Sequence, residues 1–406
     1  MQKCLSHGAY WLGAAIVLTI LAGAPAATQP SVVAPPLPGA PAAPPAPPPP
    51  IIAIPAGSST LAFKQELVDN VPGPVTCDDE VIMPVAIERP FPVMANSGAG
   101  GVAQPVTFTF RIDPDGRPLG IAQMRDMGPA GPRLYYNTAD LAPSLAASRF
   151  PAGKPQQGCQ ISYAPHTVRP AEAPVMLAQR YLVSPHARQS SDVDVFRRIH
   201  AVDTNCIDAG TPKLRARVYP DFDKIPQPRG TWAYAMIAFD IDAQGKPVKV
   251  RIASSDGNAA LDRASVDAVK KSRFAPEARH GCTYPYYRMP AEPLEAPMPP
   301  DKTTLTPANA KCDAEAKWSF MPALVFPAGF QTRRVEGWAL IGYDVAPWGQ
   351  TGNVRVLAAE PAAAFGEQAL NIVRSARKET ADTGMTGCVT MVRFVMPPTR
   401  PAADPS

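Results

Sequence analysis

The feature that most constrains this chain is a unit of about 80–90 residues that occurs three times. Each copy begins with a cysteine and continues with an aromatic–proline pair, a strand aromatic and a turn glycine, and it closes with a Gly-Cys pair. The first aromatic follows the cysteine by 14, 13 and 14 residues, and the turn glycine follows the strand aromatic by 6 residues in all three copies. An ordered set of landmarks with such constant offsets predicts an internal repeat. The landmarks are Cys77, Phe91-Pro92, Phe110, Gly116 and Gly158-Cys159; Cys206, Tyr219-Pro220, Phe239, Gly245 and Gly281-Cys282; and Cys312, Phe326-Pro327, Tyr343, Gly349 and Gly387-Cys388.

The periodicity inside each copy predicts its fold. In the third copy, apolar residues alternate from Ala339 to Val345, Pro347-Trp348-Gly349 makes a turn, and a second alternating stretch follows, so these two strands should form an antiparallel hairpin. Apolar residues then recur every three or four positions from Ala364 to Arg377, which indicates a one-faced helix. Val389 to Met396 is the last strand. We therefore expect an α+β fold of three small tandem modules, each a three-stranded antiparallel sheet with one helix (ββαβ) and one disulfide.

The cysteines indicate how these small modules are stabilised. Cys4 lies in the N-terminal segment, and the other six fall two in each copy. Six cysteines alone would allow 15 pairings, but the repeat selects one of them. A short CxxC spacing, which a zinc site needs, is absent, so disulfides are expected rather than metal ligands. The predicted pairs are Cys77 with Cys159, Cys206 with Cys282, and Cys312 with Cys388.

Residues 1–27 are expected to direct export. A weakly basic start precedes the apolar stretch Trp11 to Ala22, and the small residues Ala24-Pro25-Ala26 offer a cleavage site. The alternative is a retained anchor, because about 20 apolar residues suffice to cross a bilayer. We favour a cleaved signal peptide and hence a periplasmic protein; an inner-membrane anchor facing the periplasm is the alternative.

Proline content marks the segments between the modules. From Gln29 to Pro50, 11 of 22 residues are proline, which favours an extended semi-rigid spacer. Two short stretches, Val175 to Val183 and Asp192 to Val202, look helical. The expected division is 1–27 signal peptide or anchor, 28–60 spacer, 75–168 first copy, 169–203 linker, 204–290 second copy, 291–309 linker, 310–398 third copy and 399–406 tail.

Catalytic, cofactor and metal sites are not expected. The five histidines show no HxxxH or HExxH spacing, and Asp240 with Asp242 lies before a turn, where solvated carboxylates are common. The net charge is +4 without a long basic run, which does not favour nucleic acid. The sequence therefore predicts a protein that is not an enzyme.

The third copy carries Phe326-Pro327, Val335-Glu336-Gly337, Gly342-Tyr343-Asp344-Val345 and Asn353 to Leu357, followed by the helix and the last strand. The second copy carries Tyr219-Pro220, Phe239 to Asp242 and Arg273 to Pro276, and the first copy is the most diverged. This ordered set resembles the C-terminal domain of the TonB energy transducers. The third copy is taken as the one nearest to the family pattern. We therefore expect three tandem divergent copies of this domain.

The resemblance implies a role in protein binding within the cell envelope. In the family, a peptide of an outer-membrane receptor adds a strand to the sheet, so we expect strand addition by a receptor or another envelope protein. One alternative is an anchored energy transducer for outer-membrane transport. Another is an envelope scaffold or enzyme accessory without peptide binding. Tandem copies and disulfides depart from the usual family arrangement.

The last strand of the third copy is the expected partner-binding edge. Proline removes a backbone donor and is typical of protected edges. The second copy has Pro285 in its last strand, and Pro165 is taken as its counterpart in the first copy, whereas the third copy has no proline before Pro397. The expected partner-binding residues are Val389, Met391, Val392, Arg393, Phe394 and Val395. Coverage by the tail or by a neighbouring module is the alternative.

Overall fold

The computed structural model describes residues 64–97, 101–124, 133–187, 193–200, 203–206, 210–313 and 315–397. All described residues belong to one compact unit, 60–406, the second of the two units into which the chain divides. The expected signal peptide or anchor, spacer and tail lie outside the described residues. The second unit is mixed α+β with small antiparallel sheets and three disulfides, as the sequence predicts. We call residues 64–168 the first module, 203–290 the second module and 310–397 the third module.

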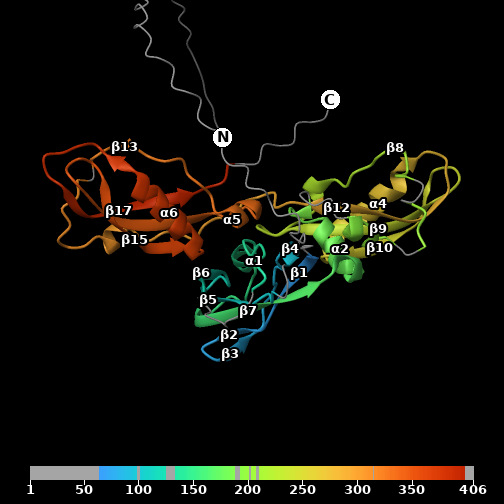
Figure 1. Ribbon diagram of the computed structural model, residues 1–406, viewed down its shortest axis with the longest axis horizontal. Coiled ribbons are helices and arrows are strands. Elements are labelled where there is room, and N and C mark those ends of the chain that lie inside the picture. The colour runs from blue at the N-terminus through green and yellow to red at the C-terminus, as the bar shows by residue number, and fades with distance from the viewer. Residues whose placement is uncertain are drawn as a thin grey trace, which may run out of the picture. The chain divides into compact units, whose positions relative to one another are not determined.

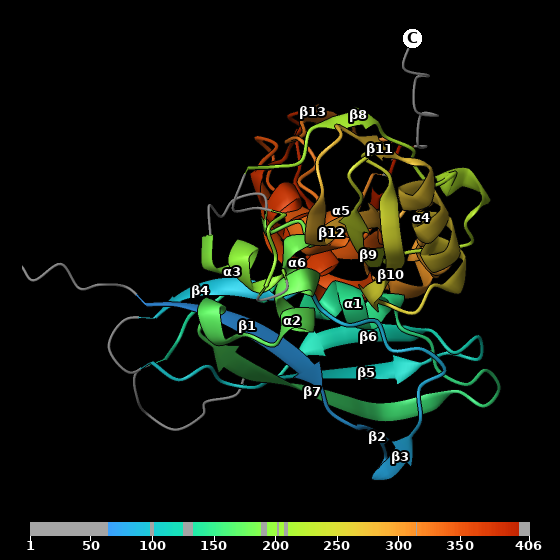
Figure 2. The same cartoon turned by 90° about the vertical axis from the view of Figure 1, so that its right-hand side faces the viewer.

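The described part of the first module contains a seven-stranded sheet and one α-helix, and the prediction of three strands is wrong for it. β5 and β6 form the expected hairpin, and β7 pairs with β5. The opposite side of β7 pairs with β1 and β2, which lie beside β4 and β3 (Figure 2). The elements are β1 (Lys64–Pro72), β2 (Val75–Cys77), β3 (Glu80–Ile82), β4 (Val93–Ser97), β5 (Val106–Ile112), β6 (Pro118–Gln123), α1 (Leu141–Ala147) and β7 (Gln156–Val168).

The length of β7 explains the additional strands. β7 has 13 residues, of which Gln156 to Tyr163 pair with β5 and Tyr163 to Val168 pair with β1. β1 precedes the expected start of the first copy at residue 75, and its pattern is not alternating, because Leu67 and Val68 are both fully buried. A strand covered on both faces lacks the alternation that reveals a half-buried strand.

The second module is built from a hairpin, a helix and a third strand. Its sheet has the order β10-β9-β12, and α4 packs on β9 and β10 (Figure 2). The Asn258 side chain accepts a hydrogen bond from Leu261 N and so caps the start of α4. The elements are β8 (Leu214–Ala216), η3 (Phe222–Lys224), β9 (Ala233–Ile241), β10 (Pro247–Ser255), α4 (Ala259–Lys271), β11 (Arg273–Phe274) and β12 (Arg279–Arg288).

The segment before the second module is partly helical, as the two short helical stretches in its sequence predict. It contains η1 (Pro170–Glu172), α2 (Val175–Leu182) and α3 (Val193–Arg198). The side chains of α2 and α3 share a small apolar cluster with Leu67 of β1. These helices therefore cover part of the first module's sheet.

The third module repeats the arrangement of the second. Its sheet has the order β15-β14-β17, and α6 lies on β14 and β15 (Figure 1). Phe365, Ala369, Ile372 and Val373 of α6 are buried at helical spacing. The elements are η4 (Lys302–Leu305), which precedes the module, β13 (Trp318–Phe320), α5 (Ala328–Thr332), β14 (Gly337–Val345), β15 (Thr351–Glu360), α6 (Ala363–Ser375), β16 (Arg377–Lys378) and β17 (Met385–Phe394).

The turn glycine has the same surroundings in all three modules. Its φ is between +74° and +86°, a conformation that favours glycine. An added Cβ would lie 2.1–2.2 Å from the carbonyl oxygen of the residue three positions after the end of the helix, which leaves no room for a side chain. The N–H of that same residue donates back to the glycine carbonyl at 2.8–2.9 Å. The glycines and their partners are Gly116 with Phe150, Gly245 with Phe274 and Gly349 with Lys378.

The disulfides have the same register in all three modules. The second cysteine of each pair lies opposite the strand aromatic of the hairpin, as Cys388 lies opposite Tyr343. The bonds join residues 82, 76 and 76 positions apart and are the same pairs that the repeat predicts. They are Cys77–Cys159, Cys206–Cys282 and Cys312–Cys388.

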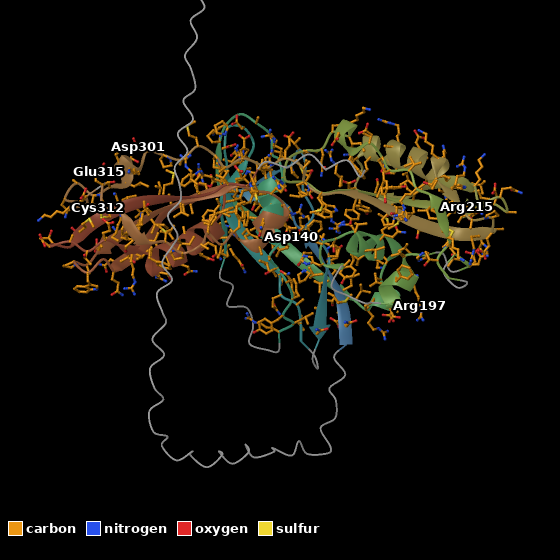
Figure 3. The ribbon with its side chains drawn as sticks, turned by 90° about the horizontal axis from the view of Figure 1, so that it is seen from above. Asp140, Arg197, Arg215, Asp301, Cys312 and Glu315 are labelled. Carbon is orange, nitrogen blue, oxygen red and sulfur yellow. A yellow bond between two sulfur atoms is a disulfide. The ribbon has the colours of Figure 1, made fainter. Side chains whose placement is uncertain are left out.

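The first and third modules share one hydrophobic core, whereas the second module has a core of its own. At the shared core, the fully buried Arg333, which follows α5, contacts two acidic groups of the first module. Its Nε and Nη2 donate to the two carboxylate oxygens of Asp140 at 2.5 and 2.7 Å, and its Nη1 donates to Glu88 at 2.6 Å. Its guanidinium carbon also lies 4.4 Å from the centre of the Phe91 ring. Asp140, labelled in Figure 3, immediately precedes α1.

Candidate functional site

The candidate site is the outer edge of β17, the side that faces away from β14. β17 pairs with β14 from Gly337 opposite Phe394 to Val345 opposite Met385. On its outer side, Lys311 and Thr386 exchange two backbone hydrogen bonds of 2.9 and 3.0 Å. From Val389 to Phe394, no second strand pairs with β17 within the described part of the chain. η4 lies beside β17 but forms no ladder with it. This stretch is therefore an edge in the hydrogen-bonding sense.

Comparison with the first module shows which residues of β17 direct their backbone outward. Ser162 of β7 accepts a hydrogen bond from Gly73 N at 2.8 Å, so its backbone groups point away from β5. Ser162 follows Cys159 by three residues, as Met391 follows Cys388, and both cysteines lie opposite the strand aromatic. Strand direction and buried face are the same, so Met391 also points its N–H and C=O outward. By alternation, Val389 and Arg393 do so too.

The side chains of the predicted partner-binding residues differ in their availability. Val389, Met391 and Val392 are half-buried and Arg393 is exposed. Phe394 is fully buried and packs on Phe365 and Phe326 with ring centres 5.2 and 5.6 Å apart, so its side chain belongs to the core. Val395 lies beyond the end of β17 and is 61% exposed. A partner strand could therefore use the outward backbone groups, together with the exposed surface at Arg393 and Val395.

The first module shows the corresponding edge in its occupied form. β2 pairs with Cys159 and Gln160, and β1 pairs with Tyr163 to Val168, both in antiparallel orientation. These residues correspond to the part of β17 that begins at Cys388. The sequence does not reveal this occupancy, because Lys64–Pro72 shows no alternation of apolar and polar residues. The edge geometry of this fold is thus compatible with an added antiparallel strand.

In the second module, the same edge carries a proline. Pro285 follows Cys282 by three residues and so corresponds to Ser162 and Met391. Met391 of β17 offers an outward N–H. Pro285, at the corresponding position of β12, has no N–H to offer. The prediction that Pro165 is the counterpart of Pro285 is wrong. Pro165 lies six residues after Cys159, not three, and pairs with Asn70 of β1. The count from the cysteine would have identified Ser162 from sequence.

Acidic side chains near the start of β17 and β12 have structural roles. Asp344 accepts hydrogen bonds from Gly387 N at 2.8 Å and Asn353 Nδ2 at 2.6 Å, and these two donors lower the pKa of its carboxyl. The corresponding Asp240 accepts from Gly281 N at 2.9 Å. Asp242 accepts from two backbone N–H groups of the hairpin turn. These carboxylates therefore stabilise the hairpin turn and the irregular backbone near the start of β12 and β17.

The remaining titratable groups of the described residues do not form the arrangement that a metal site requires. Within the described ranges, no group of three or more His, Cys, Asp or Glu side chains is arranged to hold a metal ion. His200 Nδ1 lies 2.9 Å from Phe196 O, and burial lowers the pKa of its imidazole. Within the same ranges, every helix is too short or too polar to cross a membrane.

Comparison with known proteins places a family resemblance in the second module. Residues 219–287 match the family model described as Gram-negative bacterial TonB protein C-terminal. The chain is also similar to Protein TonB of Vibrio cholerae serotype O1, with 35% identity over 68 residues. That alignment covers 17% of this chain and 28% of the length of that relative. The matched residues include β9, β10, α4 and most of β12, so the second module is similar to a TonB C-terminal domain. The family match covers the second module, whereas the motifs of the third module were expected to be nearest to the family.

Proposed function

We propose that this chain is a non-enzymatic, exported cell-envelope protein that binds a partner polypeptide by adding its strand to the outer edge of β17. The partner is a segment of an outer-membrane receptor or of another envelope protein. We also propose that all three modules are divergent copies of one TonB-like domain. Their common support is the turn glycine, the cysteine register and the order of elements in each module.

One observation carries the proposal: in the first module, the equivalent edge already holds strands of the same chain. β1 and β2 pair along β7 from Cys159 to Val168, whereas Val389 to Phe394 of β17 has no such neighbour among the described residues. A free edge that is long and proline-free can accept a strand through its backbone groups. The similarity of the second module to TonB supports a protein partner.

The register suggests a test that leaves the fold intact. Met391→Pro removes one outward N–H, and β12 carries proline at the corresponding position, so the β14–β17 ladder should persist. Val392→Pro is the contrasting change, because the backbone of Val392 faces β14 and proline there removes a ladder hydrogen bond. We expect Met391→Pro to abolish partner capture without unfolding the third module.

The measurement is capture of envelope proteins by the immobilised chain, followed by mass spectrometry, together with hydrogen exchange of β14. The matched control is Thr390→Val, which keeps every backbone donor of the strand. Loss of a receptor peptide with Met391→Pro, with unchanged exchange in β14, supports the proposal. If deletion of the third module leaves capture unchanged, the proposed edge is wrong.

A further inference from the structure

The second module contains a small cavity beside β12, separate from the outer edge of β17. Its volume is 130 Å³, and its walls include Leu214, Phe239, Phe274 and Tyr284. A cavity of about 150 Å³ with aliphatic and aromatic walls accepts a benzene ring. The cavity therefore has the size and the lining for one aromatic or leucine side chain.

Comparison with the third module shows that this part of the fold accommodates an aromatic ring. Leu214 pairs with Phe274 in the β8–β11 ribbon, as Trp318 pairs with Lys378 in the β13–β16 ribbon. In the third module, the Trp318 indole lies 5.5 Å from the ring of Tyr343, the strand aromatic. In the second module, the smaller Leu214 takes that ribbon position and is 36% exposed. At this ribbon position the third module has the large indole of Trp318. The second module has the smaller, partly exposed side chain of Leu214.

Thr283 and Arg217 are two of the polar residues that line the cavity. The buried Thr283 Oγ1 has no hydrogen-bond partner among the described residues. Arg217, which also lines the cavity, lies over the ring of Tyr284 at 4.7 Å and donates to Tyr219 Oη at 3.3 Å. It forms no ion pair with a described carboxylate. A ligand with a negative charge could pair with Arg217.

The segments that line the cavity are rich in basic residues, of which Arg217 itself lines it. Six cations lie in the lining or next to a lining residue in sequence, and none of them forms an ion pair within the described chain. Nearby, Asp267 forms no ion pair with these cations and Glu277 pairs with Arg279. Arg215, labelled in Figure 3, stands on the exposed strand β8. The six are Lys213, Arg215, Arg217, Lys270, Lys271 and Arg273.

We propose that the second module binds an acidic peptide segment of another protein, with one aromatic or leucine side chain in this cavity. The apolar walls hold the anchor side chain, and the basic residues attract the flanking carboxylates. Charge complementarity favours an acidic occupant, because the segments that line the cavity carry six cations and none of them pairs with a described carboxylate. This site is independent of the proposed strand addition at β17.

The test uses the full chain and a labelled nine-residue peptide with a central phenylalanine and four glutamates on each side. Binding is followed by fluorescence anisotropy. Replacing the phenylalanine of the peptide by alanine should weaken binding by about ten-fold to a hundred-fold, the expected effect of losing one buried ring. Binding should also weaken as salt is raised, because exposed charges are screened.

Two changes in the protein test the two halves of the site. Leu214→Trp should fill the cavity and remove the preference for phenylalanine over alanine in the peptide; Leu305→Trp, at a residue of similar exposure (37%), is its control. Arg215→Gln with Arg217→Gln should weaken binding and reduce its salt dependence, whereas Arg197→Gln on α3 should not. Circular dichroism checks that each variant folds. Met391→Pro should leave this binding unchanged, which separates the site from the one at β17.

Four outcomes would overturn the proposal. One is equal binding of the phenylalanine and alanine peptides. A second is displacement of the peptide by an equal concentration of phenylacetate, which would indicate a small-molecule site. A third is tighter binding of a single-stranded oligonucleotide than of the peptide. The last is concentration-dependent dimerisation that Leu214→Trp abolishes, since the occupant would then be a second copy of the chain.

Discussion

Replacement of Arg333 by methionine tests what joins the first and third modules. Arg333 has no exposed surface, and its guanidinium forms charged hydrogen bonds with Asp140 and Glu88 and a further bond to Arg89 O at 3.0 Å. Methionine fills much of the same volume but leaves two carboxylates buried without their cation. Removing one partner of a buried ion pair costs about 3–5 kcal/mol. We expect Arg333→Met to lower the free energy of unfolding by that amount.

The pH dependence of this loss distinguishes charge from packing. Burial already raises the pKa of Glu88 even with Arg333 present. Without the cation, the folded-state pKa of Glu88 should rise further above its unfolded value. An acid with a raised folded pKa favours the folded state at low pH and loses that contribution as pH rises through the unfolded and folded values. The loss in free energy of unfolding caused by Arg333→Met should therefore be small near pH 4 and reach its full value near pH 8.

The assay is urea unfolding followed by tryptophan fluorescence, with hydrogen exchange of α1 and α5 as a local measure. Arg355→Met is the control, because Arg355 is exposed in the same module and forms no ion pair with a described residue, so its loss should change stability by less than about 0.5 kcal/mol. Adding Asp140→Asn to Arg333→Met should restore part of the loss. A deficit below about 1 kcal/mol that does not depend on pH would refute the buried-charge argument.

Three further predictions concern the disulfide of the second module, the carboxyl of Asp256 and the N-terminus of the mature chain. Cys282→Ser should destabilise the second module by about 2–5 kcal/mol and leave exchange in the first and third unchanged, and a bond between different modules in non-reducing peptide maps would contradict the pairing. Burial raises the pKa of Asp256 to about 6, so the second module should lose about 1–2 kcal/mol as pH rises from 4 to 7, after allowance for partial solvent access, and Asp256→Asn should remove that slope in urea titrations. The mature N-terminus should lie near Ala27, and mass spectrometry that finds Met1 in membrane fractions would favour an anchor instead.

The sequence by itself determined the local plan of each module. Turn glycines such as Gly245 could be recognised because backbone with positive φ and a close carbonyl excludes every side chain. Cys206 and Cys282 could be paired because the repeat places both at constant offsets from other landmarks. The helix of the third module could be located because its buried residues recur at helical spacing. These features depend on neighbours within one copy, so a repeated local pattern is enough to reveal them.

Only the tertiary structure decided which surfaces are covered. Arg333 resembles an ordinary surface arginine in sequence, and its burial depends on Asp140 and Glu88, 193 and 245 residues away. The occupation of β7 by β1 was equally hidden, because a doubly covered strand has no alternating pattern. The same holds for the candidate site: sequence located β17, but its outward backbone groups became clear only from the pairing of Ser162 with Gly73. Edges and buried charges are set by which distant segments meet, and one copy's pattern does not contain that information.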